Sequence, residues 1–210
     1  GVPEGIRASS LVDLLKKHVY HLGITVIKEN VRSLAIDENS RIIVNTDFST
    51  FRCKYLIIAT GTKPKPIYTT DNNPIDSKHV YYSINKLKAL KNQRIAIIGG
   101  GDAAFDYALH LSNTNLISIF NKNIKPKCLP ILEKRVQELN NIKVFNSLHI
   151  SRLIHTNNTN ILEFLNTSES RITRLQYEFV LSAVGRMPRT GIIDEKINDF
   201  IQSKSNVFNI

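Results

Sequence analysis

The 210-residue chain contains only two cysteines and no tryptophan. Cys53 and Cys128 lie far apart, and neither belongs to a C-x-x-C pair or to a cluster with metal-ligand spacing. The six histidines show no pairing at metal or catalytic spacing either. We therefore expect no bound metal, no redox dithiol and no catalytic acid–base pair, and we expect both thiols to stay reduced in a cytoplasmic protein.

Long apolar runs are also scarce. No segment approaches the roughly 18 apolar residues that cross a bilayer, and no signal-peptide pattern opens the chain, so we expect no membrane association. The net charge is +10, but the basic residues are scattered and no RNA-binding motif accompanies them, so we expect no nucleic acid. Composition and anionic cofactors explain this charge, and an acidic protein partner stays open.

The most informative segment is a strand, a glycine turn and a helix. Ile95–Ile98 is a short apolar run that predicts a buried strand. A G-x-G-x-x-A pattern follows at once, and apolar residues at helical spacing continue from it as far as Leu111. The six residues of the pattern are Gly99, Gly100, Gly101, Asp102, Ala103 and Ala104. Strand, turn and helix in this order are typical of dinucleotide-binding proteins.

Each position of the pattern has a physical reason. Gly99 permits a sharp turn, and Gly101 lets the backbone approach a pyrophosphate. Ala104 is small enough for the helix to pack closely on the strand, while the unpaired amides of the first helical turn face the anion. The segment therefore predicts nucleotide binding; the alternative interpretation is a glycine-rich structural turn.

Residues at the end of the second strand, which we expect at Leu116–Phe120, should determine whether the coenzyme is NADPH or NADH. NAD sites place a carboxylate on the ribose hydroxyls about 20 residues beyond the glycines. Here the chain has Asn121, Lys122 and Lys125 and no acid. A lysine at this place can neutralise a 2′-phosphate, which favours NADPH, although NADH and plain surface lysines remain open.

The remaining pattern alternates helices and strands. Ser10 to Asp13 resembles a capping box that opens a helix ending at Gly23. After this helix the apolar patterns predict a buried strand at 24–27, a β-meander over 31–52, a buried strand at 55–59 and a connector over 62–78. Beyond the second nucleotide strand they predict a helix at 129–139, a strand at 142–145, short strands over 150–180 and a buried strand at 179–184.

Four segments, taken together, resemble thioredoxin-reductase-like flavoproteins of the pyridine nucleotide-disulfide oxidoreductase family. They are Gly1–Ile6, Ile57–Gly61, Gly99–Ala104 and Val184–Pro188. The resemblance implies an α/β fold with two Rossmann-like dinucleotide-binding domains. It places an NAD(P)H-binding domain at 64–187, inserted into a partial FAD-binding domain formed by 1–63 and 188–210.

The same resemblance implies roles for further residues. Ala59, Thr60 and Gly61 would face FAD, and Val31 would touch its adenine through the backbone. Gly185 and Arg186 would lie near the NAD(P)H site, and the turns at 59–61 and 185–188 would lie side by side where the chain crosses between domains. The implied cofactors are FAD and NADP (or NAD), and the implied assembly is a homodimer.

Two departures from the family bear on function. The FAD-type G-x-G-x-x-G is missing, and Asn206–Ile210 resembles the strand before the family's flavin-contacting Gly-Asp, so the chain resembles the middle of a longer protein and should bind FAD poorly alone. Tyr82–Asn85 occupies the place of the redox C-x-x-C. In this the chain resembles ferredoxin–NADP reductases of the thioredoxin-reductase type, whose Gly-Asp-x-Ala-x-Asp-x-Ala-Leu matches Gly101–Leu109.

The leading hypothesis is a flavin-dependent NAD(P)H oxidoreductase that passes hydride from a nicotinamide to FAD and electrons to an unidentified acceptor, such as an acidic ferredoxin. The cofactors would make and break the bonds, and the protein would position them. The alternative is a stand-alone nucleotide-binding or sensor module without catalysis.

Overall fold

The computed structural model describes residues 8–75, 77–166, 169, 171–189 and 191–193. The chain divides into two compact units, one formed by Gly1–Ala59 with Thr190–Ile210 and the other by Thr60–Arg189. The second unit is thus inserted into the sequence of the first. The segments Gly1–Ile6 and Asn206–Ile210, which carry part of the family resemblance, lie outside the described residues.

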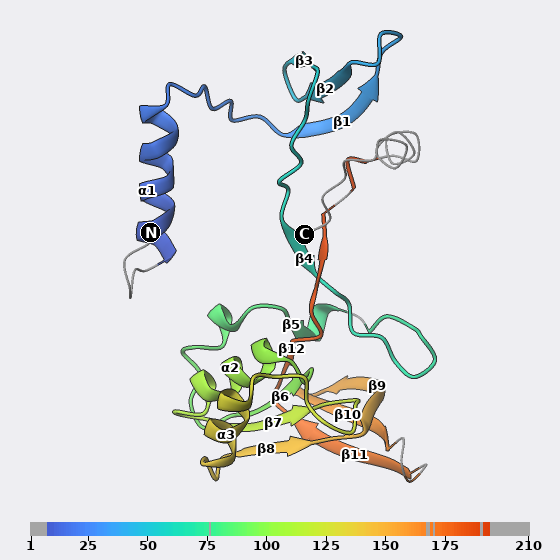
Figure 1. The fold of residues 1–210 in the computed structure, drawn as a ribbon. Helices are drawn as coiled ribbons and strands as arrows, with labels where there is room; N and C mark the ends of the chain where they lie inside the picture. Colours follow the sequence, from blue (N-terminus) through green and yellow to red (C-terminus); the bar gives the residue numbers. More distant parts are fainter. Residues whose placement is uncertain (1–7, 76, 167–168, 170, 190, 194–210) are drawn as a thin grey trace. The chain divides into compact units, whose positions relative to one another are not determined.

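The centre of the second unit is a five-stranded parallel sheet (Figure 1). Its order is β5-β12-β6-β7-β8. The strands are β5 (Val80–Tyr81), β12 (Phe179–Ser182), β6 (Arg94–Ile98), β7 (Leu116–Phe120) and β8 (Ile142–Phe145). Because both faces of this parallel sheet are covered, the central strand β6 is a continuous apolar run over Ile95–Ile98 rather than an alternating one. The strands expected at 95–98, 116–120 and 142–145 are confirmed, and the strand expected at 179–184 is confirmed over Phe179–Ser182.

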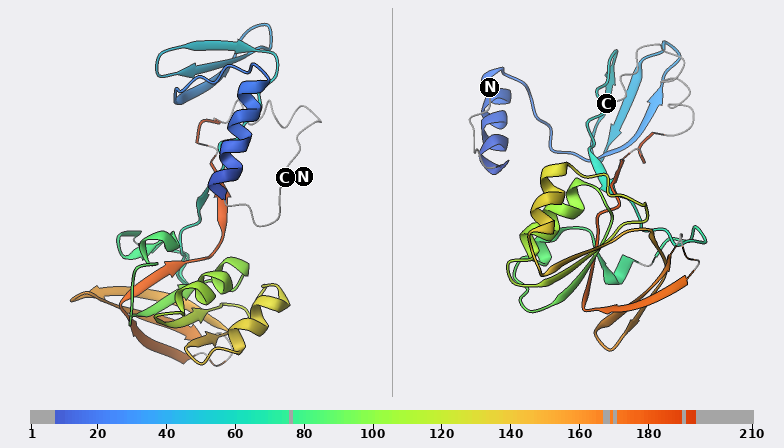
Figure 2. Two further views of the ribbon diagram at one scale, coloured as in Figure 1. Left: turned by 90° about the vertical axis from the view of Figure 1, so that its left-hand side faces the viewer. Right: turned by 60° about the horizontal axis from the view of Figure 1, so that its bottom comes forward.

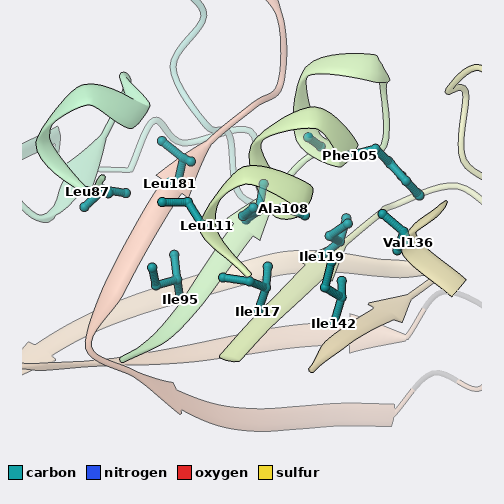
Figure 3. Packing of buried hydrophobic residues seen from close by; sticks show 12 residues of the cluster. Leu87, Ile95, Phe105, Ala108, Leu111, Ile117, Ile119, Val136, Ile142 and Leu181 are labelled. Carbon is teal, nitrogen blue, oxygen red and sulfur yellow. The ribbon is translucent and has the colours of Figure 1, made fainter. Parts of the chain in front are cut away.

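Two helices, α2 (Asp102–Leu111) and α3 (Pro130–Gln137), cover one face of this sheet. Alternate strand residues point at them, and the buried side chains interlock as Figure 3 shows. They include Ile95, Ile97, Ile117, Ile119, Ala108 and Leu111. The expected helix at 129–139 is confirmed over its central part.

An antiparallel sheet covers the other face. Its strands are β9 (Leu148–Thr156), β10 (Thr159–Asn166) and β11 (Arg171–Tyr177), and β10 lies between the other two. The rings of Phe120 and Phe164 stack between the two sheets with their centroids 4.1 Å apart. Figure 2 shows the three layers from two further sides. The short strands expected over 150–180 are confirmed as this sheet.

The two crossings of the chain into and out of the second unit form a two-stranded ribbon. β4 (Thr62–Pro64) pairs antiparallel with β13 (Arg186–Pro188). The amide of Arg189 donates to the Gly61 carbonyl at 3.0 Å, which extends the ladder. The structure therefore confirms that Thr60-Gly61 and Gly185–Pro188 lie side by side.

Two 3₁₀ turns, η1 (Ser77–His79) and η2 (Ile84–Lys86), precede and follow β5.

The first unit contains α1 (Ala8–His21) and a β-meander of β1 (Val31–Ile36), β2 (Ile42–Thr46) and β3 (Thr50–Cys53). A small apolar cluster lies on the meander, and both parts of the unit contribute to it. It contains Leu34, Val44, Leu56, Ile58, Ile192 and Ile193. The expected meander and the helix stop at Gly23, which has a φ of +65°, are confirmed.

Three expectations for the first unit are wrong. The helix begins at Ala8, so Ser10 lies inside it rather than capping it. Neither 24–27 nor 55–59 is a strand. Val26 is 56% exposed and Ile57 is 91% exposed. A short apolar run becomes a strand only where another strand offers its backbone groups, and no described strand pairs with either segment.

Among the described residues, no helix is long and apolar enough to cross a membrane.

The central core predicts a position-dependent cost of truncation. Ile119 in β7 is fully buried, whereas Ile172 in β11 is 63% exposed. We expect Ile119→Ala to lower the free energy of unfolding by about 2–5 kcal/mol because it leaves a cavity. Ile172→Ala is the matched control in a strand of the same unit, and its effect should stay within about 0.5 kcal/mol. Urea denaturation followed by circular dichroism measures both; equal losses would contradict the assigned core.

Candidate functional site

A cleft of about 820 Å³ opens in the second unit at the carboxyl ends of β6, β7 and β12. The strand order reverses there, because β7 and β8 extend the sheet on one side of β6 while β12 and β5 extend it on the other. In open α/β sheets such a reversal leaves a crevice in which ligands bind. The glycine turn, the loop after β7 and the segment Lys65–Asn72 form its walls.

The structure requires glycine at the first two positions of the turn, but not at the third. Gly99 has a φ of +140°, and a Cβ there would lie 2.3 Å from the Ala183 carbonyl oxygen. A Cβ on Gly100 would lie 2.4 Å from Asn121 Oδ1. A Cβ on Gly101 would meet no atom within 4 Å, although this residue lines the cleft as the N-cap of α2. The turn thus closes tightly onto the sheet at its first two positions and leaves open space at the third.

The start of α2 combines binding and structural roles. Ala103 is exposed and lines the cleft, while Ala104 is fully buried beneath the helix. Asp102 also lines the cleft, and its Oδ1 accepts a 2.7 Å hydrogen bond from the amide of Leu129 at the start of α3. Because the first residues of α2 line the cleft and no side chain caps the helix, the positive end of its dipole faces the cleft and favours an anion there.

The loop after β7 adds positive charge to the cleft. Lys122 lines it, as does Lys127, whereas Lys125 is exposed elsewhere. The Lys127 amide donates to the Gly100 carbonyl at 2.7 Å, which ties the loop to the glycine turn. Within the described part of the chain, neither of these two lysines forms an ion pair. Sequence reasoning missed Lys127, because it searched only near the strand end; a third lysine in the same loop was the available signal.

Asn121 occupies the place from which a ribose-binding carboxylate would act, but its side chain is directed inward. The residue is 1% exposed. Its carboxamide nitrogen donates to the Asn123 carbonyl and to Asn146 Oδ1, both at 2.9 Å. Asn121 thus belongs to the cleft by position, while its hydrogen bonds serve the protein.

The opposite wall of the cleft was not predicted. Lys65, Tyr68, Thr69 and His149 line it, and the amide of Thr70 donates to the Ile150 carbonyl at 3.0 Å, which fastens the segment to β9. The sequence marks this segment by its prolines as a connector, and nothing in its pattern indicates that it folds back over the strand ends.

The remaining candidate residues lie at three places: the cleft, the ribbon of β4 and β13, and the first unit. Gly185, with a φ of +102°, lines the cleft. The Arg186 guanidinium instead donates to the carbonyl of Thr62 at 2.8 Å within the ribbon. Thr60 and Gly61 also belong to this ribbon, where Thr60 Oγ1 donates to the Arg189 carbonyl at 2.7 Å. Val31, at the start of β1, and Ala59 belong to the first unit.

The described residues offer binding groups rather than reactive ones. They contain no cluster of three residues that could hold a metal ion. Cys128 is half-buried between Lys127 and Leu129, and burial raises the pKa of its thiol, so it is a poor nucleophile. At the place of the family's dithiol, Ser83 caps η2 by accepting from the Asn85 amide at 3.3 Å. The cleft can hold and orient an extended anion.

Comparison with known proteins agrees with this geometry. The sequence profile described as pyridine nucleotide-disulphide oxidoreductase matches residues 6–209. A ferredoxin–NADP reductase of Lactobacillus johnsonii is 29% identical over 74% of this chain and 48% of its own length. A thioredoxin reductase of Borreliella burgdorferi is 25% identical over 99% of this chain and 65% of its own length. The chain therefore spans about half to two thirds of the length of these two relatives.

Solved structures show the same fold. The thioredoxin reductase of Lactococcus lactis superimposes with a TM-score of 0.77 over 92% of this chain and 65% of its own, at 20% identity. The bacillithiol disulfide reductase of Staphylococcus aureus does so with a TM-score of 0.74 over 92% and 60%, at 16% identity.

The fold and the glycine cleft define the class of this protein as an α/β protein of the Rossmann-like, dinucleotide-binding type. The chain belongs to the pyridine nucleotide-disulphide oxidoreductase family. This is a family of FAD-containing, NAD(P)H-dependent oxidoreductases.

The second and third glycines of the turn give a matched pair of variants. Gly100→Ala should destabilise the fold by about 1–3 kcal/mol, because its methyl group would collide with Asn121, whose Cβ lies only 2.9 Å away and cannot rotate aside. Gly101→Ala should leave the melting temperature nearly unchanged, since its φ of −99° suits alanine and the space around it is open.

The same Gly101→Ala variant should nevertheless weaken NADP⁺ binding about tenfold or more, because its methyl group would occupy space that a pyrophosphate needs. Thermal melts and isothermal calorimetry measure the two effects separately. Unchanged NADP⁺ affinity in Gly101→Ala would mean that the coenzyme binds elsewhere.

Proposed function

We propose that this protein is part of a flavin-dependent NAD(P)H oxidoreductase in which the second unit binds the nicotinamide coenzyme. The observation that carries the proposal is the cleft at the switch point of the sheet. It joins a glycine turn with open space at Gly101, the uncapped N-terminus of α2, and cationic side chains without ion-pair partners among the described residues. These features fit a pyrophosphate-containing ligand.

The charge of the cleft supports NADPH over NADH. Lys122 and Lys127 lie on the loop that follows β7, where the adenosine ribose binds in dinucleotide folds. The Asn121 side chain forms hydrogen bonds within the protein, and it offers no carboxylate to the 2′- and 3′-hydroxyls of the ribose. Two lysines and no acid at this place favour a 2′-phosphate.

The first unit corresponds in this proposal to a partial FAD domain. Its described residues contain no glycine turn between a strand and a helix, so they fit only part of an FAD site, which includes Val31 and Ala59. When bound, FAD supplies the redox chemistry by accepting hydride from the nicotinamide. The residues of the cleft hold the coenzyme and orient it, and Gly185, which directly precedes β13, keeps the backbone open beside it.

The electron acceptor follows from the sequence at 82–85, which holds no cysteine. Without a dithiol at this position, the electrons would pass to a separate carrier rather than through the chain's own thiols. A net charge of +10 suits an acidic protein such as a ferredoxin, which is the partner named for the first relative. We further propose a homodimer that acts in the cytoplasm. The alternative, a nucleotide-binding or sensor module, would bind the coenzyme but transfer no hydride.

The absorption spectrum of the protein, recorded after reconstitution with excess FAD and with binding of FAD verified, distinguishes these two functions. We expect the flavin bands to bleach on anaerobic addition of NADPH, and more slowly with NADH at the same concentration. A protein that binds NADP⁺ but shows no bleaching with either coenzyme would support the sensor alternative.

Charge reversal in the cleft tests the coenzyme preference. Lysine acts on a phosphate as a point charge, so Lys122→Glu and Lys127→Glu should each raise the Kd for NADP⁺ about tenfold at low salt and leave the Kd for NAD⁺ within about twofold. Lys88→Glu, exposed in the same unit and outside the cleft, is the matched control. An unchanged ratio of the two Kd values in both cleft variants would show that these lysines are ordinary surface charges.

The thiols give a separate prediction. Cys53 belongs to the first unit and Cys128 to the second, and neither lies at positions 82–85. The Cys53→Ser/Cys128→Ser variant of the FAD-loaded protein should therefore reduce ferricyanide with NADPH at the wild-type rate. Loss of this activity with FAD still bound would show that a thiol takes part.

A further inference from the structure

We infer that Asn121 determines the coenzyme preference by positioning the cleft loops, without contacting the ribose. The inference rests on the proposed function, because it assumes that the adenosine end of NADPH lies over the loop after β7. It assigns to Asn121 a role that its place in the sequence does not suggest, since in dinucleotide folds this position contributes a ribose ligand.

The hydrogen-bonding capacity of Asn121 is exhausted within the protein. A carboxamide has two N–H donors and one oxygen with two lone pairs. Both donors are used, on the Asn123 carbonyl and on Asn146 Oδ1. The oxygen accepts from the amide of Asn123 at 3.2 Å and from its side-chain nitrogen at 3.4 Å. Nothing remains for a ribose hydroxyl unless this network opens.

Backbone hydrogen bonds of the same residues join two turns at the carboxyl edge of the sheet. The Asn121 amide donates to the Phe145 carbonyl at 2.8 Å, and its carbonyl accepts from the Leu148 amide at 3.1 Å. The Ser147 amide donates to the Asn123 carbonyl at 3.0 Å. The loop that carries Lys122 is therefore fastened to the turn between β8 and β9 on both sides of that lysine.

The same side chain supports the glycine turn. A Cβ on Gly100 would overlap the Asn121 carboxamide, so this side chain packs directly against the Gly100 backbone. Asn121 is almost completely buried. Removing its side chain would therefore leave its polar partners without hydrogen bonds and leave the glycine turn without packing support. Asn121 thus fixes Lys122 relative to the pyrophosphate-binding turn, which is the spacing that a 2′-phosphate would sense.

Aspartate at position 121 would reverse this arrangement. It is isosteric but has no N–H donor, so a carboxylate oxygen would face the Asn123 carbonyl, which can only accept, and would retain Asn146 only if that carboxamide rotated. The side chain would then be driven out of the network towards the cleft. There a carboxylate would accept hydrogen bonds from ribose hydroxyls and repel a 2′-phosphate.

Calorimetric Kd values for NADP⁺ and NAD⁺, measured on the whole chain, test the inference. We expect Asn121→Asp to lower the preference for NADP⁺ over NAD⁺ at least tenfold, with NAD⁺ binding retained or improved. Asn146→Ala removes one acceptor of the network without adding charge, and it should weaken NADP⁺ several-fold more than NAD⁺. The exposed substitution Asn113→Asp is the control for added negative charge.

The outcomes separate this inference from the proposed function. If the wild-type chain binds neither coenzyme, the proposed function fails. If it binds NADP⁺ but both network variants keep the wild-type ratio, or weaken the two coenzymes equally, Asn121 has a merely structural role and the inference is overturned. Should Asn121→Asp fail to fold, the result for Asn146→Ala alone tests the inference. That variant keeps Asn121 and its backbone hydrogen bonds to Phe145 and Leu148.

Discussion

The site depends on the close approach of three backbone segments at one edge of the parallel sheet. The Ala183 amide donates to the Ile98 carbonyl at 2.8 Å, and the Gly99 amide donates to the Phe120 carbonyl at 2.9 Å. These bonds hold the ends of β12, β6 and β7 together directly beneath the glycine turn. No side chain fits at Gly99, because its Cβ would overlap the Ala183 carbonyl. The absence of side chains is therefore what lets the cleft form.

Packing on both faces of the sheet maintains this approach. Ala104 and Ala108 bring α2 close to the strands, so the helix N-terminus is directed at the turn rather than away from it. On the other face Phe120 stacks against Phe145 and Phe164, with ring centroids 5.2 and 4.1 Å apart. The end of β7, whose Phe120 carbonyl accepts the Gly99 hydrogen bond, is thus held in place by the aromatic core.

The local patterns of the sequence predicted what local interactions determine. The glycine turn, its flanking strands, both helices of the second unit and the β-meander follow from apolar periodicity and turn residues, and the structure has them. The segments 24–27 and 55–59 have equally apolar sequences, but no described strand pairs with them. The apolar pattern alone therefore predicted two strands that the structure does not contain. Strand formation depends on partners that a window of sequence does not contain.

Apart from Gly185, which the family resemblance placed near the coenzyme, the candidate site was predictable only where one continuous segment forms it. Gly99–Ala104 and Lys122 were found because they follow a strand at known spacing. Lys127 was missed, although a backbone hydrogen bond to Gly100 brings it into the cleft, because that bond spans a loop without a regular pattern. His149 and the wall at Lys65–Asn72 were missed because they reach the cleft through tertiary contacts from distant parts of the chain.

Amide chemical-shift changes on titration of the ¹⁵N-labelled chain with NADP⁺ test the central claim most directly. If the cleft of the second unit is the coenzyme site, the largest changes will fall on Gly100–Ala104, on the loop from Asn121 to Lys127 and on Val184-Gly185. The amides of β11, on the far side of the antiparallel sheet, should be unaffected. Changes concentrated outside the cleft, or none at millimolar NADP⁺, would contradict the account.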